Sequence, residues 1–163
     1  MTIEELNSLD QDRFVEAVGW VFEHSPWVAA RAWAQRPFAG IDVLHQAMVE
    51  QVEAARLDEQ VALLRAHPDL GTRANISAAS TAEQTAAGLN GLSPEEFERL
   101  HRLNEAYRDQ FGFPFLLAVK GSTKYDVLQA LEQRLQASPE DERREALRQV
   151  HRIARFRLED TIK

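Results

Sequence analysis

Apolar residues recur at spacings of three and four over most of the chain. Two groups carry the pattern most clearly: Phe14, Val15, Val18, Val21 and Phe22, and then Leu44, Met48 and Val49. This spacing places apolar side chains on one face of a helix. Alternating strand-like runs are absent; only residues 111–119 look extended, and Gly112 and Pro114 interrupt them. The pattern predicts an all-α protein.

Prolines divide this helical pattern into segments. The breaks fall at Ser25-Pro26, Arg36-Pro37, His67-Pro68, Ser93-Pro94, Phe113-Pro114 and Ser138-Pro139. Ser93 and Ser138 have the features of N-caps, since each is followed by proline and then by acidic residues. We expect about eight helices of roughly 8 to 24 residues. They would pack as one single-domain helical bundle over residues 1–163.

Composition narrows the class of protein. Of the 163 residues, 44% are hydrophobic and 28% charged, which is ordinary for a soluble globular domain. No apolar run approaches the roughly 18 residues of a membrane span, and the first residues lack a basic leader region. The formal charge of −7 argues against nucleic-acid binding. The absence of cysteine excludes disulfides, thiol catalysis and thiolate metal sites, and fits a reducing cytoplasm.

Without cysteine or a metal-type histidine spacing, the chemistry must use imidazole, carboxylate, amide and guanidinium groups. His67 is the first candidate, because imidazole gives and takes protons near neutrality. Pro68 disfavours helical backbone at His67, so the helix carrying Val61, Leu63 and Leu64 should end there. The histidine then either projects into a cleft or caps the last carbonyls of its helix.

A second polar cluster is Ser80-Thr81-Ala82-Glu83-Gln84. Ser80 and Glu83 have the spacing of a capping box, with Ser80 as N-cap, a contact worth about 1 kcal/mol. Such a cap leaves the N–H groups of the first turn directed outward, where they can bind an anionic or carbonyl oxygen. The cluster therefore fits either a cap alone or a cap with a binding role.

Arg157 is the third candidate. On a helical projection it falls within the apolar stripe of the last helix, formed by Leu147, Val150, Ile153, Ala154 and Leu158. A buried guanidinium requires an anionic or carbonyl partner. Either an internal salt bridge, with Glu83 or Asp160, or a substrate clamp satisfies this requirement.

The segment Phe111–Val119 holds three aromatic residues around Gly112 and Pro114. It is either core-packed irregular chain or a binding edge for a flat heterocycle, because irregular backbone has N–H and C=O groups that need partners. The runs 22–27 and 36–38 are interpreted as packing at helix junctions. We assign no role to His45, His101 or His151.

Taken together, the motifs resemble the 2-oxo-4-hydroxy-4-carboxy-5-ureidoimidazoline (OHCU) decarboxylases of uric acid degradation. The resemblance covers nearly the whole chain, and the ordered set of motifs is more specific than any single one. The set is Phe22-Glu23-His24-Ser25-Pro26-Trp27, Arg36-Pro37-Phe38, Ala66-His67-Pro68-Asp69-Leu70, Ser80-x-x-Glu83-Gln84, Ala87-Gly88-Leu89, Leu103-Asn104-x-x-Tyr107, Phe111-Gly112-Phe113-Pro114-Phe115 and Arg157-Leu158.

The resemblance implies an all-α, cofactor-free and metal-free carboxy-lyase, usually a homodimer, that forms (S)-allantoin and CO2. It implies His67 as catalytic proton donor, with Glu83 and Arg157 as further active-site groups. The substrate contacts that it implies are Pro68, then Ser80, Thr81, Ala82, Glu83 and Gln84, and finally Phe115, Leu116, Leu117, Ala118 and Val119. Many family members have a longer segment after the His-Pro motif, and residues 71–76 are compact here, which leaves that side of the pocket uncertain.

The residue types also fit the chemistry. Loss of CO2 from OHCU leaves electron density that the adjacent ring imine accepts, so no cofactor is required. We expect His67 to protonate the ureido-bearing carbon, Glu83 to orient His67 or the substrate hydroxyl, and Arg157 and Gln84 to bind substrate oxygens. Two alternatives are a non-catalytic helical domain that binds a ureide, and a metal-dependent ureide hydrolase.

Overall fold

The computed structural model describes residues 1–71 and 77–163. These residues form nine α-helices and three short 3-10 helices, and they contain no strand. The all-α prediction is confirmed. The helices are α1 (Ile3–Asn7), α2 (Gln11–Val18), η1 (Gly19–Val21), α3 (Trp27–Ala32), η2 (Trp33–Gln35), α4 (Ile41–Glu53), α5 (Leu57–Arg65), α6 (Ala78–Ala86), η3 (Leu89–Gly91), α7 (Pro94–Phe111), α8 (Lys124–Arg134) and α9 (Pro139–Thr161).

Two helices are shorter than the expected minimum of eight residues. α1 has five residues and α3 has six, because turns and 3-10 helices interrupt the apolar pattern near the N-terminus. The predicted caps of α7 and α9 are present: Ser93 forms a capping box with Glu96, and the Ser138 hydroxyl accepts from the N–H of Asp141. Both caps follow from local sequence alone.

The contacts divide the chain into two compact units. The terminal unit holds residues 1–66 and 150–163, and the central unit holds residues 67–149. The expectation that residues 1–163 form one domain stays a prediction.

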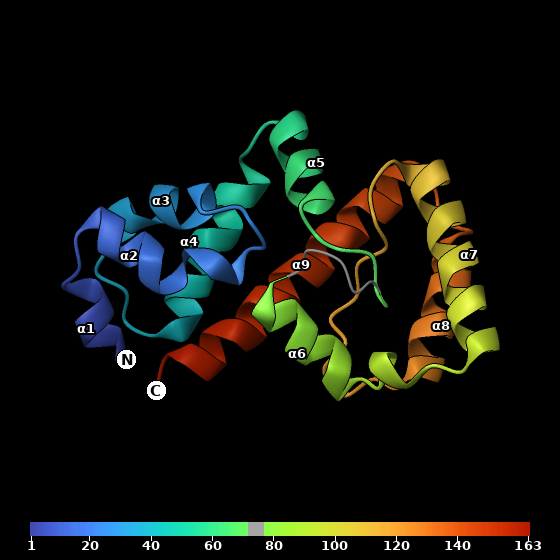
Figure 1. Cartoon of the computed structure of the whole chain (residues 1–163). Helices are drawn as coiled ribbons and strands as arrows, with labels where there is room; N and C mark the ends of the chain where they lie inside the picture. The colour runs from blue at the N-terminus through green and yellow to red at the C-terminus, as the bar shows by residue number, and fades with distance from the viewer. Residues whose placement is uncertain (72–76) are drawn as a thin grey trace. The chain divides into compact units, whose positions relative to one another are not determined.

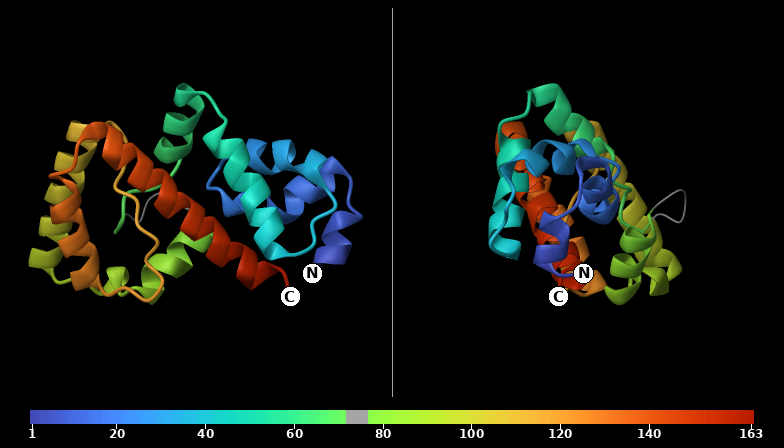
Figure 2. Two further views of the ribbon diagram at one scale, coloured as in Figure 1. Left: turned by 180° about the vertical axis from the view of Figure 1, so that it is seen from behind. Right: turned by 90° about the vertical axis from the view of Figure 1, so that its left-hand side faces the viewer.

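In the terminal unit, α2, α3 and α4 pack around an apolar core. Phe14 and Phe38 stack there with ring centroids 6.0 Å apart, and Leu44 and Met48 of α4 are fully buried. The two chain ends lie side by side in both views, and the N–H of Lys163 donates to the carbonyl oxygen of Met1 (Figures 1 and 2). The end of α9 therefore closes the terminal unit against the start of the chain.

In the central unit, α7 and α8 lie side by side and run in the same direction (Figures 1 and 2). Lys124 at the start of α8 pairs with Glu96 at the start of α7, and the Gln110 amide near the end of α7 donates to the carbonyl oxygen of Leu135 just after α8. Two parallel neighbours need a connection that returns along their length. The irregular segment 112–123 makes this return, so it packs in the core without being helical.

α9 has the apolar stripe that the sequence predicts. Leu147, Val150, Ala154 and Leu158 are buried. No described helix has the length and apolar character needed to cross a membrane.

Candidate active site

His67 is buried, with 5% of its surface exposed, and it follows the last residues of α5. The predicted helix end is confirmed within two residues, since α5 ends at Arg65. We call residues 67–71 the His67 run. Its last residue is fixed to α6, because the N–H of Gly71 donates to Gln84 Oε1 over 2.8 Å.

α7 holds the same run from a second direction. The Asn104 amide donates to the carbonyl oxygen of Leu70 over 2.9 Å, and Arg108 pairs with Asp69 over 2.9 Å. Asn104 is buried, whereas Arg108 is half exposed. Gln84 of α6 and Asn104 of α7 thus bond the backbone shortly after His67 and Pro68, and Arg108 of α7 holds the side chain of Asp69.

The start of α6 differs from the prediction. The N-cap is Ser77, whose hydroxyl accepts from the N–H of Ser80 over 3.1 Å. Ser80 is therefore the third residue of the helix, and the predicted capping box of Ser80 and Glu83 is wrong. The reason is that a further serine lies three residues upstream, which lets the helix begin a turn earlier. The N–H of Ser80 is used by this cap.

The shift places the polar cluster within α6, where helical spacing sorts it into two faces. Ser80 and Gln84 are four residues apart and buried, and Glu83 beside them is half-buried. Thr81 and Ala82 are exposed on the other side. α6 thus presents Ser80, Glu83 and Gln84 on one face. The side-chain oxygen of Gln84 accepts a hydrogen bond from the N–H of Gly71. The side-chain NH2 of Gln84 is the group suited to donate to a substrate oxygen.

The segment 115–119 lies in the core of the central unit. Phe115, Leu116, Ala118 and Val119 are buried, and Leu117 is half-buried. The Tyr107 ring contacts the Phe115 ring edge-on at 5.4 Å between centroids. The core-packing interpretation of this segment is confirmed, and its binding role stays a prediction.

A buried polar network lies behind this segment, and the sequence analysis missed it. Tyr107 donates its hydroxyl proton to Glu142, and Arg134 Nε donates to the same carboxylate over 2.7 Å. Arg134 also donates to the carbonyl oxygen of Leu116. Burial, and then the hydrogen bond to Glu142, raise the pKa of Tyr107 far above its usual range, so the phenol stays a neutral donor. The sequence feature that could have predicted this network is the spacing of Glu142, Ala146 and Gln149, which places all three on one face of α9.

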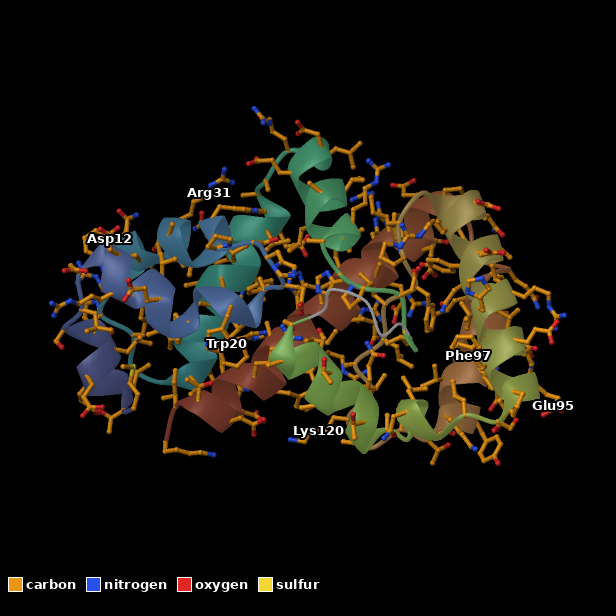
Figure 3. The ribbon with its side chains drawn as sticks, in the orientation of Figure 1. Asp12, Trp20, Arg31, Glu95, Phe97 and Lys120 are labelled. Atoms are coloured by element: carbon orange, nitrogen blue, oxygen red, sulfur yellow. The ribbon has the colours of Figure 1, made fainter. Side chains whose placement is uncertain are left out.

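Arg157 is 3% exposed, as its place in the apolar stripe predicts. Its Nη2 donates to Glu23 over 2.9 Å, and its Nη1 donates to the carbonyl oxygens of Trp20 and Val21. Figure 3 shows Trp20 on η1, where its ring lies 5.9 Å from the guanidinium carbon. Glu23 is the carboxylate on Arg157 in the terminal unit, where Asp160 was expected, and the expected pairing of Arg157 with Glu83 stays a prediction.

The predicted site residues are therefore distributed over both units. His67, Pro68, the α6 cluster and residues 115–119 belong to the central unit, and Arg157 belongs to the terminal unit. That these groups meet in one cavity stays a prediction. The expectation about the compact segment after the His-Pro motif concerns residues 72–76, which lie outside the described residues.

The central unit also holds a cavity of about 620 Å³. Asp69, Leu70 and Gly71 line it on one side, and Phe97, Leu100 and Asn104 of α7 on the other. Phe97 and Glu95 lie in the first turn of α7 in Figure 3. In the described part of the chain, none of the predicted substrate contacts lines this cavity, so the substrate is not assigned to it. No group of acidic residues and histidines suited to a metal occurs in residues 1–71 or 77–163.

Comparison with known proteins gives consistent matches. Residues 7–159 match the family model described as OHCU decarboxylase. A protein named 2-oxo-4-hydroxy-4-carboxy-5-ureidoimidazoline decarboxylase from Halalkalicoccus jeotgali is 48% identical over 160 residues, which cover 98% of this chain and 91% of that protein. A uric acid degradation bifunctional protein of Bacillus subtilis is 47% identical over 161 residues, covering 99% of this chain and 33% of that protein.

A solved structure described as (S)-allantoin synthase has a similar fold, with a TM-score of 0.78 and 38% sequence identity. The match covers 99% of this chain and 54% of that chain. This chain therefore spans about half the length of that solved structure.

Proposed function

This chain belongs to the OHCU decarboxylase family, and from that membership we propose that it converts OHCU to (S)-allantoin and CO2 during uric acid degradation. The observation that carries the proposal within the structure is the burial of His67 beside a run whose backbone bonds Gln84 and Asn104 and whose Asp69 side chain pairs with Arg108. A buried imidazole on a rigid run can deliver a proton to one face of a bound substrate.

In the proposed reaction, the bond between the ring carbon and the carboxylate breaks, CO2 leaves, and the electron pair passes into the adjacent ring imine, whose nitrogen becomes negatively charged. His67 then gives a proton to the ureido-bearing carbon. The hydroxyl loses its proton as its carbon becomes the carbonyl of allantoin, and the former imine nitrogen takes up one proton. Delivery from one side yields a single enantiomer. Solvent would protonate either face and give racemic allantoin.

Other groups bind and orient the substrate in this proposal. Glu83 orients His67 or the substrate hydroxyl, and the Gln84 amide donates to a carboxylate or ureido oxygen. The backbone of 115–119 hydrogen-bonds to the ring edge. Arg157 has five N–H donors, and the contacts with Glu23, Trp20 and Val21 pre-orient its guanidinium for a substrate anion.

The test is to add the protein to freshly generated OHCU and follow circular dichroism. We expect optically active allantoin to form faster than the spontaneous reaction produces allantoin. A non-catalytic ureide-binding domain would leave the spontaneous rate and the racemic product unchanged. A metal-dependent hydrolase would lose its activity in EDTA, whereas we expect none to be lost.

We also propose that the protein acts in the cytoplasm as a homodimer, as the family resemblance suggests. Light scattering of the protein as it elutes from a size-exclusion column should give a mass of about twice that of one 18.5 kDa chain. A mass of one chain would contradict the dimer. Fractionation of producing cells should recover the protein with cytoplasmic markers.

A further inference from the structure

Residues 114–119 form a stretch of backbone without any turn or bend. Within each trans peptide of this stretch, the C=O of one residue and the N–H of the next residue point to opposite sides. Since backbone N–H and C=O groups need partners when buried, the contacts of each residue show which side faces the protein.

The side chains of Arg134 and Gln149 form hydrogen bonds with the backbone of this stretch. Arg134 donates from Nη1 to the carbonyl oxygen of Leu116, and its guanidinium carbon lies 4.5 Å from the centre of the Phe115 ring. Gln149 Oε1 accepts from the N–H of Ala118 over 3.0 Å. The two anchors therefore act on the groups that flank Leu117, the carbonyl of Leu116 before it and the N–H of Ala118 after it.

Each anchor is itself fixed by a neighbour. The guanidinium of Arg134 is held by Glu142, which in turn accepts from Tyr107. The amide nitrogen of Gln149 donates to Glu145 Oε1 over 2.8 Å. The side chain of Arg134 is 12% exposed and that of Glu142 is 1% exposed, so the network is shielded from water.

Leu117 lies between the two anchored residues. Its N–H points away from the Leu116 carbonyl and its C=O points away from the Ala118 N–H, because each pair shares a trans peptide. Within residues 1–71 and 77–163 neither the N–H nor the C=O of Leu117 has a hydrogen-bond partner. Leu117 is also the least buried residue between Phe113 and Val119, since it alone is half-buried. The N–H and C=O of Leu117 thus face away from the anchors that hold its two neighbours.

We propose that Arg134 and Gln149 are positioning residues, which hold the backbone on both sides of Leu117 so that the N–H and C=O of Leu117 bind the donor and acceptor edge of the ureidoimidazoline ring. The inference rests on the proposed function and names residues that act through the backbone without touching the substrate. It also gives the buried Tyr107–Glu142 pair a role, because that pair orients Arg134.

The first test removes the Gln149 anchor. Gln149→Leu should raise KM about tenfold, the effect of one lost hydrogen bond, and leave kcat within about twofold. The exchanged pair Glu145→Gln with Gln149→Glu keeps an oxygen acceptor for Ala118 and a hydrogen bond between the two side chains, so it should restore KM. Gln110→Leu is the matched control, because Gln110 also bonds a backbone group, the carbonyl oxygen of Leu135, but on the exposed surface.

The second test addresses the Arg134 anchor and uses a readout that is independent of turnover. Arg134→Lys keeps a positive charge that can pair with Glu142, but it removes the planar guanidinium, which bonds Glu142 and the Leu116 carbonyl at the same time. We expect a raised KM, and faster amide hydrogen exchange at residues 116–119 than in the Gln110→Leu control.

The outcomes separate the two proposals. A wild-type protein that does not accelerate allantoin formation refutes the proposed function. An active wild type whose Gln149→Leu and Arg134→Lys variants keep the control's KM refutes the positioning inference alone. If Gln149→Leu does not fold, the exchanged pair and Arg134→Lys decide, since unchanged KM in Arg134→Lys also contradicts the inference.

Discussion

Asn104 and Tyr107 lie one helical turn apart on α7, and both are buried. Asn104 donates to the carbonyl oxygen of Leu70 in the His67 run, and Tyr107 donates to Glu142 beneath the segment 115–119. One turn of α7 therefore supports two separate parts of the proposed site.

Loss of the Asn104 contact should weaken both stability and activity. Asn104→Ala leaves the Leu70 carbonyl without its donor in a partly buried place, which should lower the free energy of unfolding by about 1–3 kcal/mol. We expect kcat to fall as well, because the His67 run is less constrained. Urea unfolding and steady-state kinetics measure the two effects. Arg108→Ala is the matched comparison, since its pair with Asp69 is exposed and worth about 1 kcal/mol or less. Equal losses in both variants would contradict this ranking.

Replacement of His67 should remove most of the catalysis. We expect His67→Gln and His67→Ala to lower kcat by about 10²–10⁴, which is the usual contribution of a positioned general acid. The residual allantoin should be racemic, because protons then come from solvent. Circular dichroism together with total allantoin measures both quantities. Near wild-type turnover with full enantiomeric purity would show that His67 is not the proton donor.

The Arg157–Glu23 pair should be costly to break from one side. Glu23→Ala removes the buried carboxylate to which Arg157 Nη2 donates, and we expect a loss of about 3–5 kcal/mol in unfolding free energy. The double variant Glu23→Ala with Arg157→Met should be less destabilised than the sum of the single variants. Arg144→Ala provides the exposed control, because its pair with Glu140 should contribute about 0.5 kcal/mol or less. Additive losses would mean that the pair is not energetically coupled.

The observed start of α6 gives a direct test of helix register. Ser77→Ala removes the cap oxygen and should cost about 1 kcal/mol of unfolding free energy. Thr85→Ala, on the exposed side of the same helix, should change stability by no more than about 0.5 kcal/mol. Thermal unfolding of the two variants compares them. A helix that begins at Ser80 would leave the Ser77→Ala variant as stable as the control.

Two histidines of the terminal unit predict a dependence of stability on pH. Burial lowers the pKa of both His151 and His45. The hydrogen bond with Glu53 acts in the opposite direction on His151, and the hydrogen bond with the backbone carbonyl of residue 151 does so on His45. The unfolded chain therefore binds protons more readily than the folded chain just below the ordinary histidine pKa of about 6.5. Their contribution is complete above that pH and declines as the pH falls toward the lowered folded values.

The measurement compares urea unfolding at about pH 7.5 and about pH 5.5. We expect the wild type to lose more stability over this interval than the double variant His45→Gln with His151→Gln. The glutamines keep hydrogen-bonding groups near Glu53 and the carbonyl of residue 151 but do not titrate. An equal loss in both proteins would assign the acid sensitivity to other groups.

The local sequence pattern was sufficient to predict several features of this protein. The helical class, the caps at Ser93 and Ser138 and the burial of Arg157 all follow from residues within one or two turns of one another. The motifs also identified the family, because their order along the chain is itself sequence information. The N-cap of α6 could not be predicted from local sequence, because Ser77 and Ser80 are both suitable N-cap residues and packing decides between them.

The partners of the buried polar groups were decided by the tertiary structure alone. Glu23 pairs with Arg157 from 134 positions away, and Tyr107 meets Glu142 from 35 positions away. Helical periodicity places a charged side chain on the buried face but carries no information on which distant segment packs against that face. Because a charge is tolerated in the core only where such a partner arrives, the sequence specified the requirement, and the packing of remote segments specified the residue that meets it.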